Sequence, residues 1–294
     1  MNNDIKLAIE NKMNCKITEY SHTGKGASAN VYKVKLNKSP YCIAVKTNDI
    51  PKLIFDEYNN IKFISEKISC KLPKIYFVDN INGKGILAME FINGVSPNNK
   101  TLLLKRNKSK LANEIVDNLI KIHSVHNDKF GPINNAVYDS WYEYYKQFAK
   151  EILDFTNSSN VSETVKYAVN TAYNKLDKII GNDKSLPTLT HGDYWAPNFI
   201  IDKQNMNLNG IIDPFNVLWA EPEYELFTLT VGYGKKLHLY ELYKSKVKTT
   251  NNCDIKVELY ALFNELLWYK ILEKIDNSYL IYRSKKLIKM MKLL

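Results

Sequence analysis

The first ninety residues alternate between hydrophobic and polar positions in short runs, as half-buried β-strands do. The pattern predicts five strands, at 17–21, 31–36, 41–46, 74–79 and 85–91. Asn82-Gly83, between the last two runs, is a dipeptide typical of a tight hairpin turn. A helix is expected at 55–67, where apolar side chains recur at helical spacing. We therefore expect a small β-rich lobe at the start of the chain.

The pattern changes to helical spacing after about residue 94. Apolar positions recur every three or four residues in three segments, which predict helices at 102–123, 140–153 and 161–180. Short strand-like runs follow at 188–190, 199–202 and 208–212, and the chain from Tyr224 onward again has a helical pattern. The order of elements predicts an α+β fold with two lobes, residues 1–93 and residues 94–294.

Composition and charge narrow the class of protein. Hydrophobic residues make up 45% of the 294 residues, which is enough for a sizeable core. The formal net charge is +10, but the lysines are scattered and no arginine-rich arm occurs, so we expect no nucleic acid partner. The four cysteines lack metal-ligand spacing, which indicates reduced thiols.

Two further observations concern membranes. No apolar run approaches the roughly 18 residues that cross a bilayer, and the first residues lack an apolar signal segment. We therefore expect a cytoplasmic protein without a membrane partner. The basic, amphipathic segment 285–294 is interpreted as a final helix packed on its own domain, with an anionic membrane surface as the alternative.

The strongest candidate for chemistry is His-Gly-Asp-Tyr-Trp-Ala-Pro-Asn at 191–198, followed by Ile-Ile-Asp-Pro at 211–214. Phosphoryl transfer needs a carboxylate that orients the acceptor hydroxyl, and oxygen ligands for the magnesium on the phosphates. Asp193 can supply the first, and Asn198 and Asp213 can supply the second. Each motif alone could be a turn, but both at this spacing favour a phosphotransferase that uses Mg²⁺.

A second candidate lies at residues 24–32, Gly-Lys-Gly-Ala-Ser-Ala-Asn-Val-Tyr. Small residues between two strands let backbone N–H groups approach phosphates, so Gly24, Gly26, Ser28 and Val31 are candidates for nucleotide binding. A plain hairpin is the alternative. The segment does not match the GxxxxGK[ST] pattern of a P-loop.

Lys46 ends the apolar run Ile-Ala-Val-Lys at 43–46. A charge at the end of a core strand needs a partner. Glu57, on the next expected helix, is the preferred partner, with Asp56 and Glu66 as alternatives.

The 191–198 and 211–214 motifs resemble the signature of the aminoglycoside phosphotransferase, choline kinase and fructosamine kinase superfamily, whose members have a protein-kinase-like bilobal fold. The resemblance implies that Asp193 is the catalytic base, that His191 braces the catalytic loop, and that Asn198 and Asp213 bind magnesium. The 43–46 run is similar to the kinase strand whose lysine, here Lys46, binds the α- and β-phosphates.

The resemblance extends to other segments. Residues 88–94 resemble the hinge that binds adenine, which implies backbone contacts from Glu90 and Ile92 and ATP as the donor, with GTP left open. His123, at the end of a helix similar to one in the superfamily, is expected to be structural. The layout is similar to fructosamine kinases, but residues 219–226 depart from that family's Gly-His-Arg-Glu segment, which leaves the acceptor open.

Three acids lie in this departing segment. Glu221 and Glu223 could bind a cationic acceptor, or could cap the following helix. Glu225 occupies the place of a structural acid in the superfamily.

Taken together, these features predict an ATP-dependent kinase for a hydroxyl of a small molecule, such as a sugar, an amino sugar or an aminoglycoside-like acceptor. A nucleotide-binding pseudokinase without turnover is the alternative. Protein substrates are disfavoured because no activation segment of the DFG-to-APE type occurs. The oligomeric state is left open.

Overall fold

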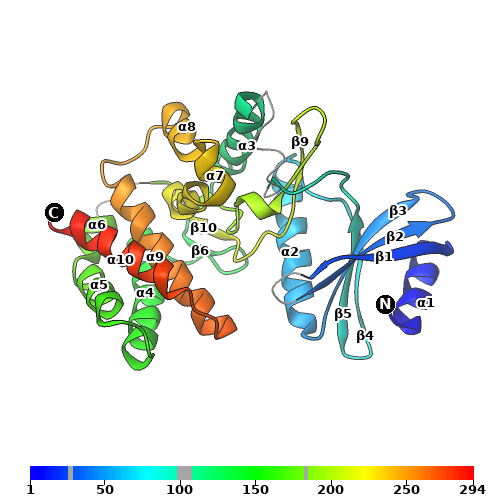
Figure 1. Cartoon of the computed structure of the whole chain (residues 1–294), viewed down its shortest axis with the longest axis horizontal. Coiled ribbons are helices and arrows are strands. Elements are labelled where there is room, and N and C mark those ends of the chain that lie inside the picture. The colour runs from blue at the N-terminus through cyan, green and yellow to red at the C-terminus, as the bar shows by residue number, and fades with distance from the viewer. Residues whose placement is uncertain (26–28, 98–107, 182–184) are drawn as a thin grey trace. The chain divides into compact units, whose positions relative to one another are not determined.

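The computed structural model describes residues 1–25, 29–97, 108–181 and 185–294, which form two compact units (Figure 1). The first unit comprises residues 1–118 and 196–215, and the second comprises 119–195 and 216–294. The elements of the first unit are α1 (Asn3–Met13), β1 (Ile17–Lys25), β2 (Asn30–Leu36), β3 (Cys42–Asn48), α2 (Pro51–Lys67), β4 (Ile75–Ile81), β5 (Lys84–Glu90), the 3₁₀ helix η2 (Ala196–Asn198), β8 (Phe199–Ile201) and β9 (Leu208–Ile211). Helix α3 (Lys108–His123) runs from the first unit into the second. The second unit contains β6 (Gly131–Pro132), α4 (Trp141–Ser158), α5 (Glu163–Asn174), α6 (Leu176–Ile180), β7 (Thr188–Leu189), β10 (Leu218–Ala220), the 3₁₀ helix η3 (Pro222–Thr230), α7 (Gly232–Lys236), α8 (Leu239–Lys246), α9 (Cys253–Leu272) and α10 (Asn277–Met291).

The first unit is built on an antiparallel sheet of five strands in the order β1-β2-β3-β5-β4. Asn82 and Gly83 join β4 to β5 with φ angles of 51° and 81°, the left-handed backbone that a two-residue hairpin needs. The hairpin expected from the sequence is therefore confirmed. The predicted strands and the α2 helix all form, with ends that differ by a few residues.

Alternating side chains of this sheet face two different helices. On one face, α1 packs through Ile5 and Ile9 against Val34, Ile43, Val45, Ile86 and Ala88. On the opposite face, α2 packs against Ala44, Leu87 and Met89 through Ile54 and Ile61. This alternation places Lys46 on the α2 face, on the same side as Ala44, because strand side chains repeat every two residues.

The β8–β9 hairpin belongs to the first unit although it lies about a hundred residues further along the chain. Val95 and Ile201 exchange two backbone hydrogen bonds of 3.0 Å, and Ile211 N donates to Lys71 O at 2.7 Å. Gly94 has a φ of 150°, and a Cβ there would lie 2.6 Å from the oxygen of Ile201, so only glycine fits. The lobe boundary expected after residue 93 stays a prediction.

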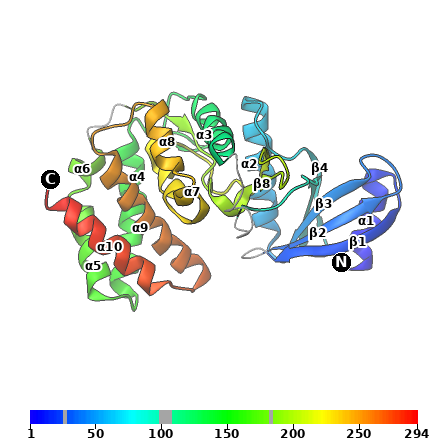
Figure 2. The same cartoon turned by 45° about the horizontal axis from the view of Figure 1, so that its top comes forward.

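The second unit is mainly helical. Helices α4, α5, α9 and α10 run alongside one another (Figure 2). Helix α9 is the central one, and Leu259, Phe263 and Leu266 on it are completely buried. In α10, Leu280 and Leu287 are also buried, so the final helix packs on its own unit. The helix expected at 161–180 is two helices, because Lys175 leaves helical geometry with φ −107° and ψ 11°.

A small sheet of β6, β10 and β7 completes the second unit, with Trp219 opposite both Gly131 and Leu189. It leads directly into the segment that begins at His191. The α+β fold class is confirmed, with a β-rich first unit and a helical second unit. Helix α1 and the strands β6 and β10 were not expected. Among the described ranges, no helix is long and apolar enough to cross a membrane.

Candidate active site

The first unit brings three charged side chains together from β3, α2 and the end of the β8–β9 hairpin. Lys46 Nζ lies 2.7 Å from Glu57 Oε2 and also forms an ion pair with Asp213 Oδ1. The side chains of Lys46 and Glu57 are only 13% and 10% exposed, whereas that of Asp213 is 38% exposed. Asp56 instead pairs with Lys52 and Glu66 with Lys62, so Glu57 is the acid that contacts Lys46.

The charges of this group set its protonation. Burial disfavours the charge on Lys46, but the Glu57 and Asp213 carboxylates outweigh it and raise the pKa of Lys46 above its ordinary value. Burial raises the pKa of Glu57 to about 8 against the opposing charge of Lys46, and Asp213 adds to the rise. The two shifts have different origins, because the carboxylates raise the pKa of Lys46, whereas burial is the main cause of the raised pKa of Glu57. Lys46 stays cationic, and of the two acids Asp213 is the more open to a ligand.

The β8–β9 hairpin explains why Asn198 and Asp213 are neighbours. Asn198 ends η2 just before β8, and Asp213 follows β9 by two residues. Phe199 and Ile211 are paired in the hairpin, and Ile212 N donates to Asn198 O at 3.0 Å. Asp213 has a φ of 58°, a conformation that aspartate tolerates better than most residues. The fifteen positions that separate these two residues in the sequence are therefore closed by a short hairpin.

The donor set of this hairpin fits a magnesium ion. Asn198 offers an amide oxygen and Asp213 a carboxylate, both hard ligands, and magnesium is usually held by one or two such groups together with phosphate oxygens. Among the described residues, no cluster of three or more histidine, cysteine or acidic side chains could hold a metal by itself. The residues thus fit a metal that the nucleotide helps to bind, rather than a metal held in a cage of protein ligands.

The other nucleotide-binding candidates lie in the same unit. Gly24 on β1 is paired with Val31 on β2, and a Cβ on Gly24 would meet nothing within 4 Å. Gly26 and Ser28 lie outside the described residues. Glu90 ends β5, and Ile92 follows it and lies directly against Gly210 of the β8–β9 hairpin.

The second unit carries the segment with Asp193. The chain leaves the small sheet after β7, at Thr190 and His191. The next residue, Gly192, has a φ of 79°, which favours glycine. His191 is completely buried and packs edge-on against Tyr194, with ring centroids 5.5 Å apart. Asp193 N donates to His191 Nδ1 at 3.4 Å. The bracing role expected of His191 remains a prediction, but its ring lies against the loop that holds Asp193.

The Glu225 carboxylate binds the backbone of this loop. Its carboxylate accepts from Gly192 N at 2.9 Å and from His191 N at 3.1 and 3.2 Å, and it is joined to His123 Nε2 at 2.8 Å. His123 Nδ1 is joined in turn to the Tyr243 hydroxyl at 2.8 Å. Burial disfavours the carboxylate, but the bonds from His123 and the loop outweigh it and lower the pKa of Glu225. A buried, ionised Glu225 therefore fixes the loop that presents Asp193.

Glu221 is the N-cap residue of η3 and Glu223 lies in its first turn, but the Glu221 side chain makes no capping hydrogen bond and neither residue faces solvent. Both are buried, and both pair with the ammonium of Lys256, at 2.8 Å and 3.0 Å. Tyr260 donates to Glu221, and Thr250 donates to Glu223 through N and Oγ1. Lys256 was not predicted as a partner of these acids because it lies inside the hydrophobic run of α9. Its charge within that run is the signal that could have revealed a buried ion pair.

The fructosamine kinase family model matches residues 1–292. No curated protein matches the chain. A solved structure of a protein assigned as a fructosamine-3-kinase from Haemophilus somnus 129PT has 15% identity and a TM-score of 0.75, over 98% of this chain and 96% of that one. A ternary complex of a thermostable mutant of aminoglycoside phosphotransferase APH(4)-Ia with AMP-PNP and hygromycin B has 12% identity and a TM-score of 0.75, over 98% of each chain. The gentamicin complex of APH(2")-IIa has 19% identity and a TM-score of 0.66, over 98% of this chain and 96% of that one.

These likenesses define the class of the protein. The neighbours confirm the kinase-like fold that the motifs implied. The chain belongs to the fructosamine kinase family. It is a small-molecule phosphotransferase.

Proposed function

We propose that the chain transfers the γ-phosphate of ATP to a hydroxyl of a fructosamine, that is, of an N-substituted 1-amino-1-deoxyfructose. The observation that carries the proposal is the ion-paired group of Lys46, Glu57 and Asp213, together with a family match over nearly the whole chain. Phosphoryl transfer depends mainly on positioning and on charge stabilisation, and this group can provide both.

The first unit would bind the nucleotide. Lys46 contacts phosphate oxygens, and Glu57 holds the ammonium in place at 2.7 Å. Asn198 and Asp213 would hold the metal, and Mg²⁺ bound there would neutralise charge on the phosphates. In the described part of the β1–β2 hairpin, Gly24 and Val31 bring backbone N–H groups to the phosphates, and in the hinge the backbone of Glu90 and Ile92 binds the base.

The second unit would supply the base. Asp193 accepts the proton of the acceptor hydroxyl while that oxygen forms its bond to the γ-phosphorus, and the bond from phosphorus to the β-bridging oxygen of ATP breaks to release ADP. Glu225 holds the His191 and Gly192 amides, so the position of Asp193 is set before the substrate arrives.

The acceptor is inferred from the family match and from two candidate acidic residues whose carboxylates are already bound within the protein. Glu221 and Glu223 were candidates for binding a cationic acceptor, but Lys256, Tyr260 and Thr250 occupy both carboxylates. The acidic segment therefore gives no support to a polycationic aminoglycoside. The match of the fructosamine kinase family over residues 1–292 supports the sugar amine instead.

An acceptor panel tests this proposal. The full chain is mixed with magnesium and ATP, or with magnesium and GTP in parallel. One acceptor is added at a time: a fructosamine, an amino sugar or hygromycin B. ADP release and phosphate-ester formation are followed together. We expect equal amounts of ADP and ester, the highest kcat/KM for the fructosamine, and no turnover after magnesium is chelated. If no acceptor raises ADP release above the rate measured without an acceptor, the result would support a pseudokinase. A higher kcat/KM for hygromycin B than for the fructosamine would refute the proposed acceptor.

A further inference from the structure

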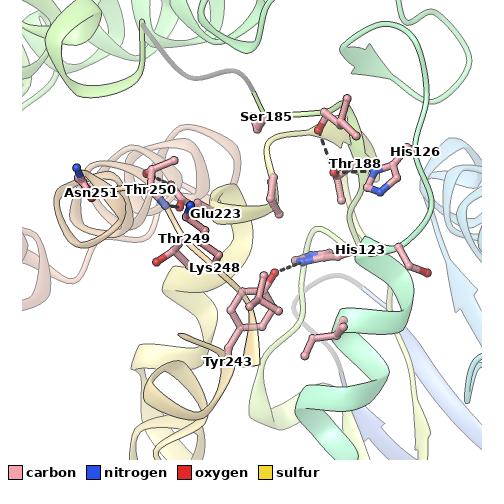
Figure 3. Close-up of a pocket in the computed structure, with 15 residues that line it drawn as sticks. His123, His126, Ser185, Thr188, Glu223, Tyr243, Lys248, Thr249, Thr250 and Asn251 are labelled. Carbon is pink, nitrogen blue, oxygen red and sulfur yellow. Dashed lines mark hydrogen bonds between the residues drawn. The ribbon is translucent and has the colours of Figure 1, made fainter. Parts of the chain in front are cut away.

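The second unit contains a cavity of about 820 Å³ that none of the residues proposed for phosphoryl transfer lines. Its walls come from the end of α3, the entry to β7, the start of η3 and the segment between α8 and α9. Figure 3 shows Ser185, Thr188 and His126 on one side, Thr249 and Thr250 on another, and the pair of His123 and Tyr243 below them. The volume falls within the range of small-molecule sites, roughly 300–1,000 Å³.

The described residues that line this cavity offer a ligand a positive charge. Glu223 is the one acid among its described lining residues, and it is 2% exposed and bound to Lys256 and Thr250. Lys248 also lines the cavity and is exposed, and its ammonium has no acidic partner within the part of the chain that the structure describes. An anion can approach Lys248 without competing with an acid that is free among the described lining residues.

The remaining lining combines polar side chains, among them Ser124, Ser185, Thr249 and Asn251, with apolar ones. Thr188 Oγ1 donates to Leu186 O at 2.9 Å, so it can only accept from His126 Nδ1, 3.2 Å away. This leaves the Nε2 edge of His126 for a further hydrogen bond. Ile120 and Val247 provide apolar walls, and a ligand would cover the apolar Leu186, which is 60% exposed.

We propose that this cavity binds a small organic anion, with its charged group near Lys248 and its apolar body against Ile120 and Val247, and that the bound anion alters turnover. The second part rests on the proposed function. Tyr243 and His123 form the floor of the cavity, and their hydrogen bonds of 2.8 Å continue to Glu225, which holds the His191 and Gly192 amides. A ligand that binds better to one arrangement of these bonds shifts the loop that carries Asp193.

Binding is tested with 8-anilino-1-naphthalenesulfonate, a fluorescent organic anion with an apolar body, titrated into the full chain. We expect one saturable site whose affinity is unchanged by saturating AMP-PNP and magnesium. Lys248→Glu should weaken binding about tenfold, because it reverses the charge that meets the sulfonate. Lys236→Glu, an exposed lysine on α7 outside the cavity, is the matched control and should leave the affinity within about twofold.

A second pair of variants tests the apolar wall. Val247→Asp should also weaken binding, whereas Ile271→Asp, at a half-exposed position on α9, should not. Equal affinity in the wild type, Lys248→Glu and Val247→Asp, or displacement of the probe by AMP-PNP, would overturn the site. The coupling is measured as kcat with saturating probe. We expect a change of up to about tenfold that Lys248→Glu abolishes, and an unchanged kcat at full occupancy would overturn the coupling. If the chain shows no turnover with any acceptor, the proposed function is refuted, and the binding experiment still tests the cavity independently.

Discussion

Replacing Glu225 by glutamine should be among the most damaging conservative changes in the second unit. The Glu225 carboxylate is completely buried and accepts from two backbone amides besides its bond to His123. Hydrogen bonds to a charged group contribute about 1.5–3 kcal/mol each. Glutamine keeps one oxygen but turns an NH₂ donor toward other donors, so at least one bond is lost and a donor is left unpaired. We expect the free energy of unfolding to fall by about 3–5 kcal/mol.

Urea denaturation followed by circular dichroism measures this difference. Glu151→Gln is the matched control, because Glu151 is exposed and lies 3.7 Å from Lys270 at the surface, where an ion pair contributes about 0–1 kcal/mol. A loss within about 0.5 kcal/mol for Glu225→Gln, equal to the control, would refute the reasoning. It would mean that the buried carboxylate does not hold the loop.

The same variant makes a prediction about pH. The pKa of Glu225 is lowered from its ordinary value of 4.5, so its contribution to stability is present above that value and is lost as the pH falls through the native pKa. The wild type should therefore lose stability more steeply than Glu225→Gln as the pH falls below about 4.5, and the gap between the two should narrow. A gap that stays constant between pH 7 and pH 3.5 would contradict the assignment of the ionised form.

Three further variants test other residues of the second unit, by urea denaturation or by enzyme kinetics. Lys256→Met should lower the free energy of unfolding by about 3–5 kcal/mol, because two buried carboxylates lose their cation; a neutral result in urea denaturation would show that these acids are protonated or rearranged. Gly192→Ala should cost about 1–2 kcal/mol of strain at a φ of 79° and should lower kcat more than it changes nucleotide affinity, as steady-state kinetics and titration can show; unchanged kcat would contradict it. Trp195→Ala removes a side chain that is 40% exposed two residues after Asp193, so KM for the acceptor should rise in acceptor titrations while the melting temperature holds, and the reverse pattern would mark Trp195 as structural.

Features that depend on neighbouring residues could be predicted from the sequence. The Asn82-Gly83 turn and the strands around it carry their signals locally, in turn chemistry and in period-two alternation. The motif at 191–198 likewise contains both Asp193 and Asn198. Helix α1 was missed because its buried apolar side chains are few, chiefly Ile5 and Ile9, and such a short stripe resembles a polar segment.

Features that depend on distant partners could not be read from the sequence. Whether Glu221 faces a substrate or a buried cation depends on Lys256, which reaches it only when α9 packs against η3. The link from His123 to Tyr243 spans 120 positions and has no local pattern. Two alternatives were expected for Glu221, and neither included Lys256, because a lysine inside an apolar run can signal a buried ion pair but does not reveal which acids are its partners.

The role of Asp193 is the central claim, and Asp193→Asn tests it most directly. The full chain is assayed with magnesium, ATP and a fructosamine, and nucleotide affinity is measured by titration. Asp128→Asn, at an exposed position, is the matched control. We predict that kcat for Asp193→Asn falls by a factor of about 10²–10⁴, the usual contribution of a general base, while the dissociation constant for the nucleotide stays within about threefold. Activity of Asp193→Asn equal to that of Asp128→Asn would contradict the assignment of the base.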